Sequence, residues 1–244
     1  MSAPTPAAVP GTLYCVPTPI AEGRDPAEDL APGVLARVAG LDYVIAENAK
    51  TARAVLGRMP LERPIQRIEI VELSEHTRDD AIAPMLAPLI AGRSAALMSE
   101  AGCPGVADPG ARLVRAAHAA SVPVAPMVGP SALLLALMGS GLNGQRFAFA
   151  GYLPTDAETR RRRLRELEQR SRREDETQLF IETPYRNQPM LDALLATLAP
   201  STLLCVAADL TGARQSLRTR RVDAWRRAPP TLERVPTVFL FLAA

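Results

Sequence analysis

Short apolar runs, most of which contain β-branched residues, alternate with longer segments of helical periodicity over the first half of the 244-residue chain. The runs have strand length and lie at residues 12–16, 42–46, 67–73, 94–98 and 122–128. The segments between them have apolar residues at spacings of three and four, which is typical of amphipathic helices; they are residues 30–40, 51–59, 79–92 and 111–120. This alternation predicts a parallel sheet covered by helices on both faces.

The pattern breaks at GSGLNGQR (139–146), where three glycines and an asparagine occur close together. Beyond the break the chain is again α/β but more mixed, with a long charged helix, a second helix and an irregular stretch before the last strand. The apolar runs predicted as strands there are residues 147–151, 178–182, 201–208 and 236–242. We therefore predict a disordered lead-in over 1–10, an N-terminal α/β domain over 11–142 and a C-terminal α/β domain over 143–244.

Composition and charge exclude several kinds of site. The three cysteines, Cys15, Cys103 and Cys205, lie far apart without CxxC spacing, and the chain has only two histidines. Neither a disulfide framework nor a metal site is therefore predicted. The net charge of +2 does not by itself indicate nucleic-acid binding. The start of the chain lacks a signal-peptide pattern, and the longest apolar stretches are far below the roughly 20 residues that span a bilayer. We predict a cytoplasmic protein without a membrane segment.

Three loops rich in glycine and proline follow predicted strands: PTPIAEG (17–23), SEAGCPGVADPG (99–110) and VGPSALL (128–134). Ligands of open α/β sheets bind outside the carboxyl ends of the strands, so we expect these loops to line one crevice. Ser131 is placed to cap a helix that begins at residue 132. Each loop alone has the alternative of an ordinary strand-to-helix turn. No GxGxxG follows the first strand and no GxxxxGK[ST] occurs, which disfavours a dinucleotide site and a P-loop.

Five segments of the chain resemble a known family in their order and spacing. They are GTLYCVPTPI, SEAGCPGVADPG, GPSALLLALMGSGL, FAFAGYLP and IETPYR, and they are similar to the ribosomal small-subunit methyltransferase I family. That family belongs to the tetrapyrrole-methylase class of S-adenosylmethionine (SAM) enzymes. The resemblance implies two α/β domains with SAM in a cleft between them, usually a homodimer, and an RNA substrate. The activity it implies is 2′-O-methylation of a cytidine in small-subunit ribosomal RNA.

The resemblance also implies which residues meet the cofactor. They belong to the three loops and are Pro17, Thr18, Pro19, Glu100, Ala101, Gly102, Cys103, Gly105, Ser131 and Ala132. An acidic group such as Glu100 would favour the positive sulfonium end of SAM. Transfer to a ribose hydroxyl requires the acceptor oxygen to be positioned in line with the methyl carbon, and a general base would help to remove its proton. The candidates for catalytic residues are His76, Glu182 and Arg186, with a structural ion pair as the alternative for the last two.

Two segments depart from the family pattern. AENAKTAR (46–53) keeps Glu47, but Asn48 and the residues after it replace the common acidic-aspartate-threonine-arginine run. ETPYR (182–186) has Tyr185 where histidine is common. These changes indicate a short, divergent branch. They leave two alternatives open: a SAM methyltransferase for a tetrapyrrole or another small molecule, and a non-catalytic SAM-binding homologue.

Residues 158–174 contain eight arginines and admit two interpretations. One is a surface that contacts RNA phosphates. The other is a solvated amphipathic helix in which Leu164 and Leu167 face the core while Glu166 and Glu168 pair with arginines. Aromatic residues that could stack on RNA bases are sparse. The best placed are Tyr152 and Tyr185, for which partial burial at a strand end is the alternative.

Overall fold

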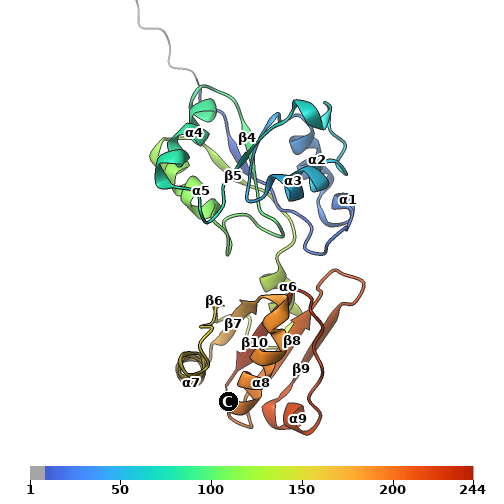
Figure 1. Cartoon of the computed structure of the whole chain (residues 1–244), viewed down its shortest axis with the longest axis vertical. Helices are drawn as coiled ribbons and strands as arrows, with labels where there is room; N and C mark the ends of the chain where they lie inside the picture. Colours follow the sequence, from blue (N-terminus) through green and yellow to red (C-terminus); the bar gives the residue numbers. More distant parts are fainter. Residues whose placement is uncertain (1–8, 244) are drawn as a thin grey trace, which may run out of the picture. The chain divides into compact units, whose positions relative to one another are not determined.

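The computed structural model describes residues 9–243, so most of the predicted lead-in over 1–10 lies outside the described residues. The chain divides into two compact units, of which the first ends at Ser131 and the second begins at Ala132 (Figure 1). Each unit contains one five-stranded sheet with helices packed on it. The mixed α/β class predicted from the sequence is confirmed.

All neighbouring strands in the sheet of the first unit are parallel. Their spatial order is β3-β2-β4-β1-β5. The strands are β1 (Leu13–Cys15), β2 (Tyr43–Ala46), β3 (Glu69–Glu72), β4 (Ala95–Met98) and β5 (Val124–Pro126). Because β4, β1 and β5 are adjacent and parallel, the three glycine- and proline-rich loops leave the same edge of the sheet side by side.

Helices cover both faces of this sheet, as predicted. The helices α2 (Pro32–Ala39) and α3 (Ala49–Leu56) pack on one face, and α4 (Ile82–Ile90) and α5 (Gly110–Ala119) pack on the other. Successive residues of β2 point in opposite directions, so Val44 joins the first of these cores and Ile45 joins the second. Short turns complete the unit: α1 (Pro26–Asp29), η1 (Ile65–Arg67) and η2 (Asp79–Ala81).

The sheet of the second unit is mixed and has the order β6-β7-β10-β8-β9. Its strands are β6 (Phe147–Tyr152), β7 (Thr177–Glu182), β8 (Leu203–Ala208), β9 (Ser216–Arg221) and β10 (Thr237–Leu242). β6 and β7 are parallel, whereas β10 pairs antiparallel with both β7 and β8, and β8 pairs antiparallel with β9. The central strand β10 is continuously apolar from Val238 to Leu242 because both faces of the sheet are covered.

One face of this sheet packs against α7 (Ala157–Glu174), α8 (Asn187–Thr197) and α9 (Val222–Arg227). Their core includes Phe180 stacked on Phe239, with ring centroids 5.6 Å apart. The opposite face packs against α6 (Ala132–Ser140). The turn η3 (Pro184–Arg186) joins β7 to α8.

The structure places α6 in the second unit, whereas we predicted it in the N-terminal domain with a boundary after residue 142. Ala136 and Leu137 of α6 are buried against Leu179 and Leu240 of the second sheet. The helix is apolar around most of its circumference, so its sequence shows that it is buried but not which sheet buries it.

The stretch after β8 is not irregular throughout, which corrects the prediction: it contains β9 and α9. β9 is an edge strand in which Leu217 and Thr219 are partly buried, whereas Arg218 and Arg220 are exposed. Because only one face of this strand is covered, its sequence SLRTRR lacks the apolar run that marks the other strands.

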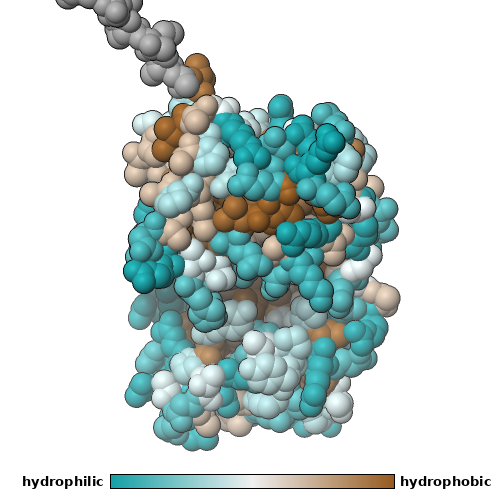
Figure 2. All heavy atoms as spheres, turned by 45° about the horizontal axis from the view of Figure 1, so that its top comes forward, coloured by the Kyte–Doolittle hydropathy of each residue, from teal (hydrophilic) through white to brown (hydrophobic). Residues whose placement is uncertain are grey.

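Within residues 9–243, no helix is long and apolar enough to cross a membrane. The face of the molecule in Figure 2 is mostly hydrophilic, with separate hydrophobic patches.

Candidate functional site

The loops that follow β1 and β4 are joined by backbone hydrogen bonds at the carboxyl edge of the first sheet. The N–H of Thr18 donates to the carbonyl of Gly102 at 2.9 Å, and the N–H of Gly102 donates back to Thr18 at 3.1 Å. The Thr18 hydroxyl, which is fully buried, donates to the carbonyl of Ser99 at 3.4 Å. The sequence prediction brought these loops to one edge, and the structure shows them paired.

The loop after β5 packs against both of the others. A Cβ atom added to Gly129 would lie 2.4 Å from the Cβ of Pro17, so glycine allows the loops after β1 and β5 to touch. The thiol of Cys103 donates to the carbonyl of Pro130 at 3.3 Å. Burial, and secondarily the negative charge of Asp108, raise the pKa of this thiol. A protonated Cys103 thus links two loops and is a poor nucleophile.

A fourth loop, which follows β2, completes this edge. The N–H of Glu47 donates to the carbonyl of Met98 at 3.0 Å, and its carboxylate accepts the N–H of Glu100 at 3.2 Å. Thr51 donates its hydroxyl to the Glu100 carboxylate at 3.4 Å. Asn48 begins α3 by accepting hydrogen bonds from the backbone N–H groups of residues 50 and 51. The segment AENAKTAR, which departs from the family pattern, therefore supports the loop that carries Glu100.

Asp108 closes the loop after β4 on itself. Its two carboxylate oxygens accept the N–H of Gly105 at 2.8 and 2.9 Å, and one of them accepts the N–H of Gly110 at 2.6 Å. Gly102 and Gly105 have φ values of +73° and +82°, a region that favours glycine. Burial raises the pKa of Asp108, and the hydrogen bonds from Gly105 and Gly110 oppose the rise.

Glu47 and Asp108 support this edge, and neither was among the residues predicted for the site. A local signal exists for Asp108, since an aspartate shortly before a glycine commonly accepts backbone N–H groups in a turn. No local signal exists for Glu47, because its partner Glu100 is 53 positions away in the chain.

Carboxylates gather at this edge. They include Glu47, Glu100 and Asp108, and residues 17–19, 99–105 and 129–131 contain no lysine or arginine, although the segment after β2 also carries Lys50 and Arg53. Burial raises the pKa of Glu47, and the negative charges of Asp108, Glu100 and Glu75 add to the rise, against one hydrogen bond from the N–H of Glu100 that lowers it. Such an edge favours a ligand with positive charge or hydrogen-bond donors and disfavours a phosphate.

The raised pKa of Glu47 predicts a pH-dependent effect of Glu47→Gln on stability. A carboxyl group whose pKa is raised by folding stabilises the fold below its unfolded pKa, and that contribution is lost as the pH rises through its folded pKa. The free energy of unfolding of the variant relative to wild type should therefore increase from acidic to neutral pH. Urea unfolding at a series of pH values measures this difference, with the exposed Glu22→Gln as the control. A difference that falls with rising pH would contradict the assignment.

The candidates for catalytic residues occupy different settings. His76 lies in the loop after β3 with its side chain 87% exposed. The side chain of Glu182, at the end of β7, is fully buried and pairs with Arg186 at 3.0 Å. Glu182 also accepts the N–H of Thr183 at 2.8 Å. Glu182 and Arg186 therefore form a structural ion pair, which is the alternative that we predicted for them. A catalytic role for His76, Glu182 and Arg186 stays a prediction.

Two of the residues predicted for the cofactor site lie at the boundary between the units: Ser131 ends the first unit and Ala132 begins α6.

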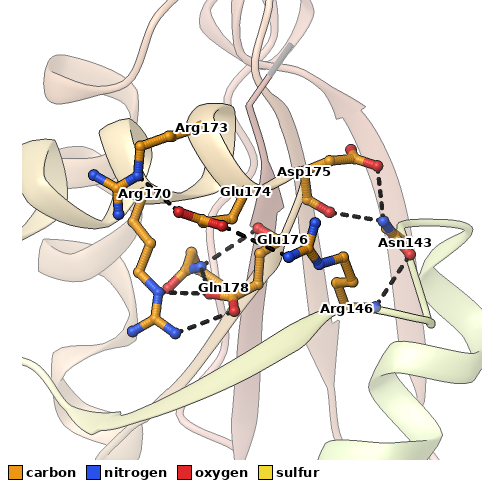
Figure 3. Close-up of polar contacts among 8 residues, drawn as sticks. All are labelled: Asn143, Arg146, Arg170, Arg173, Glu174, Asp175, Glu176 and Gln178. Atoms are coloured by element: carbon orange, nitrogen blue, oxygen red, sulfur yellow. Dashed lines mark hydrogen bonds and ion pairs between the residues drawn. The ribbon is translucent and has the colours of Figure 1, made fainter.

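The arginine-rich helix α7 is amphipathic, with Leu164 and Leu167 buried. Several of its arginines are paired with acidic residues on the helix or close to it. Arg170 pairs with Glu176 at 2.8 Å, and Arg173 pairs with Glu174 at 2.7 Å. Figure 3 shows both pairs.

Two expectations about side chains in the second unit are wrong. Glu168 does not pair with an arginine: it is buried and accepts hydrogen bonds from the Ala199 N–H and the Thr202 hydroxyl, because it lies on the core side of α7. The tyrosines are not partly buried, since Tyr152 is 59% exposed and Tyr185 is 67% exposed. Tyr152 is on the edge strand β6, and Tyr185 is in the short turn η3.

Comparison with known proteins agrees with this architecture. Residues 12–224 match the family described as Tetrapyrrole (Corrin/Porphyrin) Methylases. The chain is 37% identical over 202 residues to ribosomal RNA small subunit methyltransferase I of Xylella fastidiosa, covering 83% of this chain and 69% of the relative. It is 34% identical over 201 residues to the protein of the same name from Synechocystis sp., covering 82% of this chain and 67% of the relative.

Solved structures with the same fold include the methyltransferase CobJ, with a TM-score of 0.62 and 20% identity over 96% of this chain and 93% of that chain. Uroporphyrin-III-C-methyltransferase from Thermus thermophilus has a TM-score of 0.56 and 18% identity over 95% of this chain and 92% of that chain. At these identities the likeness concerns the fold alone. With the family match and the relatives, it shows that the chain belongs to the tetrapyrrole methylase family, in the branch of ribosomal RNA small subunit methyltransferase I, and is a SAM-dependent methyltransferase.

Proposed function

We propose that this enzyme methylates a ribose 2′-hydroxyl in the RNA of the small ribosomal subunit. The names of its relatives supply the substrate class. The charge of the chain supports it, because the first unit has 11 lysine and arginine residues against 14 acidic ones, whereas the second has 17 against 12. The two units thus have net charges of −3 and +5. This division suits a cationic cofactor held by the first unit and a polyanionic substrate attracted by the second.

The residues at the carboxyl edge of the first sheet fit SAM. When bound, SAM supplies a methyl group on a positively charged sulfur. The carboxylates of Glu47 and Glu100 would favour that charge or accept hydrogen bonds from the amino or hydroxyl groups of the ligand. The glycines at 102 and 105 have no side chain to keep a ligand from the backbone. We therefore assign the predicted cofactor-binding residues of the three loops to SAM, and we add Glu47 as a positioning residue for Glu100.

The function is tested by incubating the protein with SAM labelled in its methyl group and small ribosomal subunits that lack methylated ribose. We expect label in the small-subunit RNA, at a position where the phosphodiester bond resists alkaline hydrolysis because its 2′-hydroxyl is blocked. Label in the RNA at an alkali-sensitive bond would leave an RNA methyltransferase with another acceptor atom. No label in the RNA, together with label in a tetrapyrrole supplied in a parallel incubation, would overturn the proposal in favour of the small-molecule alternative.

The assignment of the cofactor loops has its own measurement, independent of any acceptor. Calorimetry with S-adenosylhomocysteine should show binding by the wild type that is weakened roughly five- to tenfold by Glu100→Ala, because a hydrogen-bond acceptor for the ligand is lost. Ser131→Ala should weaken it as well. Glu62→Gln is the control and should bind like wild type, since Glu62 is exposed and lies outside these loops. If Glu100→Ala and Ser131→Ala both fold and bind the ligand like wild type, these loops do not form the cofactor site.

The homodimer and the cytoplasmic location stay predictions.

A further inference from the structure

A pocket of about 200 Å³ lies in the second unit, between β8, β9, α9 and the segment that precedes β10. Its apolar lining consists of Val206, Ala208, Trp225, Pro230, Leu232 and Val235. Its polar lining includes Arg214, Ser216, Arg218, Thr231 and Glu233. Pockets for drug-sized ligands are typically about 300–1,000 Å³. This pocket therefore suits a smaller group, of the size of one ring system.

Two arginines line the pocket, and they differ in whether the guanidinium group has an ion-pair partner. The exposed guanidinium of Arg218 has no hydrogen bond or ion pair within residues 9–243. Arg214 pairs with Glu233 at 2.8 Å and more distantly with Asp209 at 3.9 Å, and Arg214 and Glu233 come from the two segments that flank the pocket. Their side chains are 63% and 61% exposed, so the pair contributes little to stability and can exchange partners. An anion at the pocket would meet one free guanidinium and one that is easily released.

The chemistry of this lining selects the ligand. The lining is about equally polar and apolar, so a group that fits must present a small body with both apolar surface and hydrogen-bonding atoms, and a negative charge next to it. A ribonucleotide has these features, since its base has apolar faces and polar edges and its phosphate pairs with guanidinium groups. Given the substrate class under Proposed function, on which this step rests, we propose that the pocket holds one unpaired nucleotide of the RNA substrate. Its base lies on the apolar lining and its phosphate pairs with Arg218.

Trp225 makes the proposal directly measurable. It is the only tryptophan of the chain and lines the pocket, and its indole N–H donates to the carbonyl of Leu204 at 2.9 Å. Trp225 is 3% exposed and the Arg220 guanidinium lies over its ring, 5.4 Å from the centroid, so the indole reports on changes in the pocket around it. A base seated in the pocket should therefore change the fluorescence of Trp225. Titration of the wild type with transcribed small-subunit RNA should give a saturable change.

Arg218→Ala should raise the dissociation constant for RNA roughly five- to tenfold, because a charge-assisted hydrogen bond to a phosphate is lost. It should also reduce the slope of log K against log salt by about 0.7–1, the amount expected for one phosphate contact. The affinity for S-adenosylhomocysteine should not change. Arg227→Ala is the matched control, since Arg227 is an exposed arginine of α9 outside the pocket lining.

A second variant tests the base rather than the phosphate. Ser216→Phe places an aromatic ring at an exposed position of the edge strand β9, where strands tolerate it, and fills the pocket. We expect weaker RNA binding with an unchanged salt slope and no change in Trp225 fluorescence. Glu233→Gln should act in the opposite direction and tighten binding, because it removes a negative charge from the pocket lining and the nearer carboxylate partner of Arg214.

The results of these experiments distinguish a failure of the pocket assignment from a failure of the proposed function. Equal weakening by Arg218→Ala and Arg227→Ala would show that only the overall charge matters and would overturn the pocket assignment. Wild-type RNA affinity in Ser216→Phe would overturn it as well. A wild type that binds S-adenosylhomocysteine but neither binds nor methylates RNA would instead remove the proposed function, and the pocket assignment with it.

Discussion

Gly129→Ala is expected to lower the free energy of unfolding of the first unit by roughly 2 kcal/mol. The added Cβ would lie 2.4 Å from the Cβ and 2.6 Å from the Cγ of Pro17, and 3.1 Å from a methyl group of Leu30. Pro17 is a rigid ring in a buried loop, so it cannot rotate away. The loops after β1 and β5 must therefore separate. Urea unfolding followed by circular dichroism measures the loss.

Gly33→Ala is the matched control for this prediction. Gly33 lies in the first turn of α2, and a Cβ there would meet nothing within 4 Å. Alanine at such a position is expected to stabilise the protein by about 0.4–1 kcal/mol, chiefly because it restricts the unfolded chain. If both variants changed stability in the same direction, the close contact between Gly129 and Pro17 would not be the cause.

The separation of the loops should also affect the proposed cofactor site. Thr18 is adjacent to Pro17 and is bonded to Gly102, so a shift of the loop after β1 is transmitted to the loop that carries Glu100. We expect Gly129→Ala to weaken S-adenosylhomocysteine binding by more than the roughly tenfold expected for Glu100→Ala, since it displaces several contacts at once. Binding at the wild-type level by the folded variant would show that these loops do not position the ligand.

The parallel sheet of the first unit could be predicted because its strands are buried on both faces. Such strands are continuous apolar runs separated by amphipathic helices, and β2 and β4 show this pattern. The spatial order β3-β2-β4-β1-β5 could not be predicted in the same way, because it depends on packing between helices rather than on any single segment.

The second unit shows where sequence patterns carry less information. The edge strand β9 was missed because one of its faces is solvated and bears arginines, whereas the strands β7, β8 and β10 are buried enough to be recognised. The position of α6 was missed for the opposite reason, since a helix that is apolar on nearly every side can be buried by either sheet.

The candidate site was predicted at the level of loops rather than of contacts. Strand order and direction bring the three loops to one edge, and glycine and proline mark them in the sequence. The contacts that hold them, such as Thr18 to Gly102 and Cys103 to Pro130, join residues far apart in the chain. Glu47 was present in the sequence as a remnant of a family motif, but its bond to the N–H of Glu100 requires the folded sheet.

Asp108→Ala is expected to lower the free energy of unfolding by roughly 2–3 kcal/mol. It removes the acceptor of the N–H groups of Gly105 and Gly110, and Gly110 is buried where water cannot replace the carboxylate. The glycines at 102 and 105 make this loop costly to order, so without Asp108 we expect it to open. Hydrogen exchange of residues 99–110 should accelerate, and S-adenosylhomocysteine should bind more weakly if the loop holds the cofactor.

Asp108→Asn separates the hydrogen bonds from the charge. Its carboxamide keeps one oxygen that can accept the N–H of Gly110, or that of Gly105, and it avoids burying a negative charge close to Glu47. Because burial raises the pKa of Asp108, the ionised group costs stability at neutral pH that the amide does not. We therefore expect Asp108→Asn to lie much closer to wild type than Asp108→Ala, and to gain stability relative to wild type as the pH rises from acidic to neutral. Equal losses in both variants would mean that the charge of Asp108, rather than its acceptor oxygens, holds the loop in place.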